Sequence, residues 1–163
     1  MTQNDKFIKR DRMRYSKDSL SSGLVLMSIV FDVLYFVSIY KSDVGSYYYT
    51  WMIGASVIYN LLFLLTAFLA SQGVKNRKSG YGLTLLVLGI MQIVRIFYLP
   101  AKAHAAVLEI GQDQLQVMSD GQHTYVVACL IVSAVCCVAA AVTNYINNKQ
   151  LAEHMRQLNN KAA

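Results

Sequence analysis

The chain has 163 residues, of which 55% are hydrophobic and only 15% are charged, and its formal net charge is +6. A soluble domain usually carries about 25% charged residues, so this composition excludes an ordinary soluble enzyme, a disulfide-rich secreted scaffold and a disordered chain. The deficit in charge comes from four long apolar segments at residues 20–40, 51–71, 81–100 and 124–144. Each segment is close to the roughly 20 residues that a helix needs to cross about 30 Å of hydrocarbon.

These segments predict an all-α fold, a four-helix transmembrane bundle with short loops that occupies residues 20–144. A basic arm at 1–19 precedes the bundle, and an amphipathic tail at 145–163 follows it. The outer loop at 101–123 contains a turn dipeptide and short stretches in which apolar and polar residues alternate. A short helix and a small hairpin both fit this loop, and the choice stays open.

Local signals place the ends of the helices. Pro100, the single proline, is expected to stop the third helix. Four serines are candidate N-caps for the first helix: Ser16, Ser19, Ser21 and Ser22. The fourth helix is expected to continue past the membrane, because Leu151, Met155 and Leu158 have the i, i+4, i+7 spacing of one helix face.

The placement of Lys and Arg predicts the orientation. Twelve of these side chains lie in the arm, in the loop after the second segment and in the tail, whereas the 41–50 and 101–123 loops carry one each. Short segments rich in Lys and Arg stay in the cytoplasm. The sequence therefore predicts that both termini are cytoplasmic and that the 41–50 and 101–123 loops face outside.

The arm contains a run of basic side chains, namely Lys9, Arg10, Arg12 and Arg14. We interpret it as a juxtamembrane segment that contacts anionic lipid headgroups, each Lys or Arg contributing about 1 kcal/mol. A nucleic-acid partner is not expected, because acidic residues interrupt the run and the chain has no room for a nucleic-acid-binding fold.

Five of the polar residues inside the apolar segments are singled out by their depth: Asp32, Asn60, Gln92, Arg95 and Ser133. At 1.5 Å per residue, all five fall about 7–14 Å from the outer ends of their helices, and therefore in one layer. A lone charge at a helix centre costs about 2.5–3.5 kcal/mol. We therefore expect an ion pair between Asp32 and Arg95, with Gln92 and Asn60 completing its hydrogen bonds. Such a pair can fix the order of the helices, line a ligand or ion pathway, or bind a helix of a partner.

Small residues recur every four positions in the fourth segment, at Cys129, Ser133, Cys137 and Ala141. Small residues let helix backbones approach closely in lipid, so this face is expected to pack against a helix. The neighbour is either a helix of the same bundle or a helix of another subunit.

The sequence predicts no metal site, no cofactor and no enzymatic activity. Its cysteines and histidines lack ligand spacing, and no phosphate-binding loop, nucleophile elbow or paired acids occur. We interpret the chain as a small non-catalytic accessory or structural subunit of a larger membrane complex of the transport type. The alternative is a self-sufficient oligomeric transporter or channel that uses the Asp32–Arg95 pair. Its partners would be the lipid bilayer and either another membrane protein or further copies of itself. Compact loops without N-x-S/T sites favour a bacterial cytoplasmic membrane.

Overall fold

The computed structural model describes residues 17–40, 51–78, 80–105, 107–110 and 113–162. It contains four long helices, α2 (Ser19–Ile39), α4 (Trp51–Lys75), α5 (Gly80–Ile96) and α7 (Asp120–Ala162). A short helix, α6 (Leu99–Ala105), and an antiparallel hairpin, β1 (Val107–Ile110) with β2 (Asp113–Gln116), connect α5 to α7. The loop between the third and fourth segments therefore holds both a helix and a hairpin.

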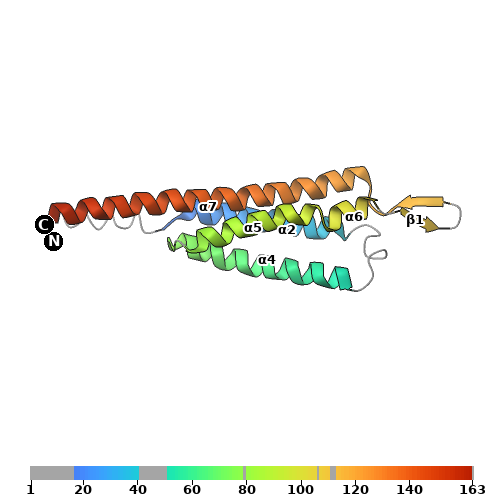
Figure 1. The fold of residues 1–163 in the computed structure, drawn as a ribbon, viewed down its shortest axis with the longest axis horizontal. Helices are drawn as coiled ribbons and strands as arrows, with labels where there is room; N and C mark the ends of the chain where they lie inside the picture. The colour runs from blue at the N-terminus through green and yellow to red at the C-terminus, as the bar shows by residue number, and fades with distance from the viewer. Residues whose placement is uncertain (1–16, 41–50, 79, 106, 111–112, 163) are drawn as a thin grey trace.

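The prediction of an all-α bundle with four helices long and apolar enough to span a membrane is confirmed. The helices lie side by side, the hairpin projects from one end, and α7 continues beyond the other end (Figure 1). We call these the hairpin end and the basic end; the latter carries Lys75, Arg77, Lys78 and Lys149. Large apolar side chains cover the outside of the bundle, as lipid contact requires. Residues 1–16 of the basic arm, with Lys9, Arg10, Arg12 and Arg14, lie outside the described residues, and so do residues 41–50.

The N-cap of α2 differs from the four serines that the sequence offered. Asp18 caps the helix: its Oδ1 accepts a hydrogen bond from the backbone N–H of Ser21 at 3.1 Å. Aspartate is among the best N-cap residues, because its carboxylate satisfies a free N–H of the first turn. Ser21 and Ser22 instead lie inside the helix and are buried.

The third helix ends earlier than the sequence predicted. α5 stops at Ile96, four residues before Pro100, and Pro100 is the second residue of α6. Proline has no N–H to donate to the carbonyl four residues earlier, and its ring crowds the preceding turn. Before Pro100 the backbone hydrogen bonds join residues three apart instead of four. The N–H of Phe97 donates to Val94 O, and the N–H of Tyr98 donates to Arg95 O. Proline is well tolerated in the first turn of the new helix.

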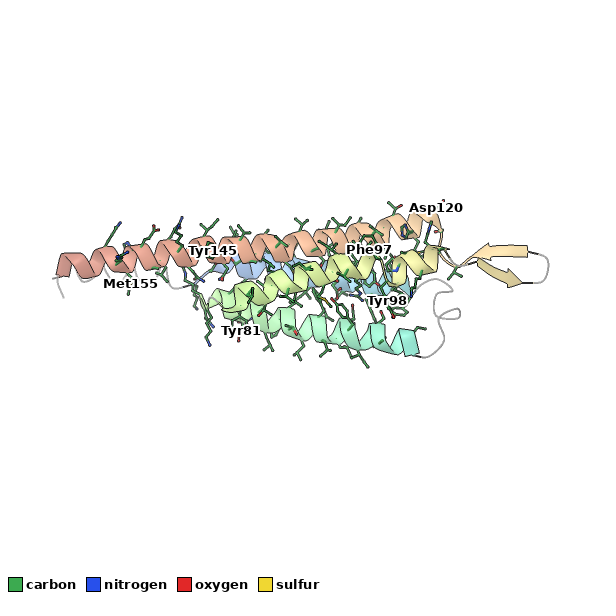
Figure 2. All side chains as sticks on the ribbon, viewed as in Figure 1. Tyr81, Phe97, Tyr98, Asp120, Tyr145 and Met155 are labelled. Carbon is green, nitrogen blue, oxygen red and sulfur yellow. The ribbon has the colours of Figure 1, made fainter. Side chains whose placement is uncertain are left out.

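The fourth helix is continuous over 43 residues, about 64 Å at 1.5 Å per residue. Ser119 is its N-cap residue. The Oγ of Ser119 accepts a hydrogen bond from the N–H of Gln122, and its carbonyl accepts one from the N–H of His123. The part of α7 beyond the basic end carries Met155, which is exposed (Figure 2). Leu151 is half-buried, and the side chain of Leu158 lies outside the described part of the tail.

Two apolar clusters fill the bundle, one toward each end. The cluster at the hairpin end includes Tyr35, Leu99 and Leu130, and the cluster at the basic end includes Phe63 and Leu85. Ser28 and Asp32 of α2, Gln92 of α5 and Ser133 of α7 are buried between these two clusters. The helices are therefore joined at mid-length by hydrogen bonds and toward both ends by apolar contacts.

Candidate functional site: a buried polar cluster

The structure brings the five predicted residues together. Arg95 Nη1 lies 2.9 Å from Asp32 Oδ1, which forms the expected ion pair between α5 and α2. Gln92 Nε2 donates to the same oxygen at 2.9 Å. Asp32 and Gln92 are fully buried, and Arg95 is 7% exposed. The pair is thus removed from solvent, where an unpaired charge would be costly.

The Arg95 guanidinium is held on several sides. Its Nη2 donates to Asn60 Oδ1 of α4 at 2.6 Å. Its Cζ lies 4.2 Å from the ring centroid of Tyr35 and 4.9 Å from that of Tyr59. A cation over an aromatic face is stabilised by the quadrupole of the ring. The sequence interpretation missed these two tyrosines, although Tyr35 lies one turn after Asp32 and Tyr59 directly precedes Asn60.

The fourth helix joins the cluster through Ser133. Its Oγ accepts from Gln92 Nε2 at 3.3 Å and lies 2.8 Å from Ser28 Oγ of α2. Ser133 Oγ also lies within hydrogen-bond distance of the Ser28 carbonyl, at 3.1 Å. Ser28 Oγ further contacts Cys137 Sγ at 3.0 Å. We call Ser28, Asp32, Asn60, Gln92, Arg95 and Ser133 the polar cluster; its members come from all four long helices.

Two buried atoms of the polar cluster have no hydrogen-bond partner among the described residues, Asp32 Oδ2 and Gln92 Oε1. A cavity of about 260 Å³ reaches Arg95 from the side where α4 and α5 face each other. Its walls include Ser56, Tyr59 and Tyr98, and the rest of the lining is apolar. The arrangement can therefore hold a proton acceptor and a cation out of water, next to a small space beside Arg95.

The small-residue face of the fourth helix is covered by the chain itself. Cys129, Ser133, Cys137 and Ala141 are all buried. Cys137 and Ala141 belong to the apolar cluster at the basic end, and Cys129 belongs to the cluster at the hairpin end. This face therefore serves packing within the bundle.

A second polar junction, which the sequence interpretation did not find, lies at the basic end. Asp18 Oδ2 accepts from Ser21 Oγ at 2.6 Å and from Asn147 Nδ2 at 2.9 Å, and Asp18 N–H donates to Lys75 O at 3.0 Å. Burial acts to raise the pKa of Asp18, but these hydrogen bonds and the nearby Arg77 charge outweigh it and leave the pKa below its usual value. The junction ties α2, α4 and α7 together where they leave the bundle.

His104 of α6 and His123 of α7 lie close together at the hairpin end. His104 Nε2 lies 2.8 Å from Asp120 Oδ1, and the rings of His104 and His123 have centroids 4.3 Å apart. Within the described residues, no group of three His, Cys, Asp or Glu side chains has a geometry that can hold a metal ion. The polar cluster is therefore the candidate site with the most buried and most connected polar groups.

Comparison with known proteins finds no matching family model, no matching curated protein and no matching solved structure.

Proposed function

We propose that this chain is a small, non-catalytic accessory or structural subunit of a larger membrane assembly of the transport type. The observation that supports the proposal best is the use of the buried charges inside the chain. Arg95 is bonded to Asp32 and Asn60, and all four long helices contribute to the network around it. An ion pair of this kind fixes which helices are neighbours, and it neutralises the two charges against each other within the chain.

The remaining surfaces suit contact with other molecules of the membrane. α7 extends beyond the basic end and exposes Met155 there (Figure 2). The four long helices fit an integral membrane protein, and α5 and α7 expose large side chains such as Leu83 and Val135. A bundle whose helices are held together by buried hydrogen bonds, and from which one helix projects, is well suited to stabilise a partner.

A transporter or channel is the second candidate, and one observation favours it. The cavity beside Arg95 is adjacent to a cluster in which Asp32 Oδ2 has no partner among the described residues. If water filled this cavity, the pair would border a path for a polar solute.

Labelling of introduced cysteines separates the two functions. In a variant without Cys129, Cys136 and Cys137, a cysteine is placed at Asn60, Gln92 or Ser56. Ser56 lines the cavity and makes no hydrogen bond to the ion pair, so Ser56→Cys leaves the pair intact. A subunit with a dry interior predicts that a charged, membrane-impermeant thiol reagent leaves all three positions unlabelled in open membrane fragments.

The exposed position Lys102→Cys is the labelled control in the same background. Labelling of Ser56→Cys at a rate close to that of Lys102→Cys would show a water-filled pathway and would contradict the accessory role. Melting temperatures of the variants show whether labelling at position 60 or 92 reflects a damaged fold.

A further inference from the structure

A groove at the basic end lies between α5 and α7, outside the polar cluster. It has a volume of about 660 Å³, and its walls include Leu83, Leu86, Val142, Asn144, Asn148 and Lys149. Leu83 is 70% exposed, and Lys149 is exposed as well. The groove therefore combines an apolar wall with a cation and two amides.

The two amides are incompletely bonded. Asn148 Nδ2 donates to Asn144 Oδ1 at 3.2 Å, but Asn144 Nδ2 and Asn148 Oδ1 have no partner among the described residues. Asn144 is 1% exposed, so its free donor has lost most of its contact with solvent. A buried donor without a partner is costly, and a polar ligand at the groove would relieve that cost.

The charge at this level is positive. Lys149 forms no ion pair with the described residues, including Glu153 one turn later on α7. Arg77 Nη1 donates to the carbonyl of Asn147 at 3.0 Å, which brings the basic α4–α5 connection against α7 beside the groove. An anionic group therefore complements this end of the groove, whereas a cationic group does not.

The apolar part of the groove continues along the bundle. A second cavity, of about 640 Å³, also lies between α5 and α7, shares Val142 with the first, and runs past Val138 and Val135 to Ile131. From Val142 to Ile131 the distance along α7 is about 16 Å, close to half of the roughly 30 Å of hydrocarbon in a bilayer. Tyr145 and Phe97 mark its two ends on the α5–α7 side (Figure 2).

We propose that this groove is a binding site for an anionic phospholipid of the leaflet at the basic end. The phosphate lies at Lys149, Asn144 Nδ2 donates to an oxygen of the headgroup or glycerol, and Asn148 Oδ1 accepts from a headgroup hydroxyl. An acyl chain lies along Val142, Val138 and Val135. The site does not depend on the accessory role, since a transporter with this surface would bind the same lipid.

Native mass spectrometry of the purified full chain tests the site. The protein is exchanged into detergent with equal amounts of phosphatidylglycerol and phosphatidylcholine, and the retained lipids are counted. We expect one phosphatidylglycerol, retained in preference to phosphatidylcholine by about fivefold or more, the factor that one basic residue at a lipid surface supplies. Lys149→Glu should abolish the preference. Lys78→Glu changes the charge equally at the same end but outside the groove, and should preserve the preference.

Val142→Trp provides a second variant, which fills the groove and keeps Lys149. We expect it to retain neither lipid. Equal losses in Lys149→Glu and Lys78→Glu, or full retention in Val142→Trp, would overturn the proposal. Should the variants fail to fold, photo-cross-linking of the unaltered chain with a photoreactive phosphatidylglycerol still decides: adducts at 82–86 and 142–149 support the site, and adducts only elsewhere refute it.

Discussion

Asp32→Ala is expected to lower the free energy of unfolding by about 3 kcal/mol, the cost of leaving one charge unpaired among membrane-spanning helices. The substitution removes the only ion-pair partner of Arg95 among the described residues, and in the unsubstituted chain Arg95 is only 7% exposed. Unfolding in mixed micelles with increasing dodecyl sulfate, followed by near-ultraviolet circular dichroism, measures the loss. The amount of protein in the membrane fraction should fall in parallel.

Charge exchange is the control for this prediction. Asp32→Arg and Arg95→Asp each place two like charges in the polar cluster, and the double variant restores one charge of each sign. We expect the double variant to accumulate better than either single variant. Equal accumulation of all three would mean that Asp32 and Arg95 do not pair within one chain.

Gly89→Leu is expected to destabilise the bundle by about 1–3 kcal/mol through overpacking. A Cβ at this position would lie 2.9 Å from Val138 Cγ2 and 3.3 Å from the carbonyl oxygen of Ala134, so α5 would have to move away from α7. The backbone of Ala134 belongs to a continuous helix and cannot yield locally. The same unfolding measurement gives the loss.

Gly23→Leu is the matched control for Gly89→Leu. A Cβ at Gly23 meets nothing within 4 Å. Both substitutions exchange glycine for a better helix former, a gain of up to about 1 kcal/mol, so their difference isolates the packing between α5 and α7. A loss in Gly89→Leu no larger than in Gly23→Leu would show that this close approach does not matter for stability.

The sequence carried enough information for the four helices and for the polar layer. Long apolar segments predict spanning helices by length alone, and counting residues from the helix ends placed Asp32, Asn60, Gln92, Arg95 and Ser133 at a common depth. One acid and one base at matching depth then pair because neither is stable alone in hydrocarbon. The pairing of Arg95 with Asp32 therefore followed from the energetics of isolated charges.

The junction at the basic end could not be predicted in the same way. Asp18 bonds to Asn147, 129 residues later in the chain. Asp18 is a cap residue of α2, and Asn147 is one of several polar residues in the second half of α7. Nothing in their spacing separates them from side chains that face water. The break at Ile96 also escaped prediction, because Pro100 stops a helix within the preceding turn rather than at its own position.

Purification of the tagged chain from its native membranes in a mild detergent, followed by mass analysis of the intact complex, tests the accessory role most directly. An accessory subunit is expected to be recovered with unrelated membrane proteins in fixed stoichiometry. Their retention should survive washing at high salt, since large apolar side chains such as Leu83 of α5 and Val135 of α7 are exposed on the bundle. Copies of this chain alone, with no other subunit attached, would contradict the accessory role and would favour the alternative, an oligomeric transporter or channel that uses the Asp32–Arg95 pair.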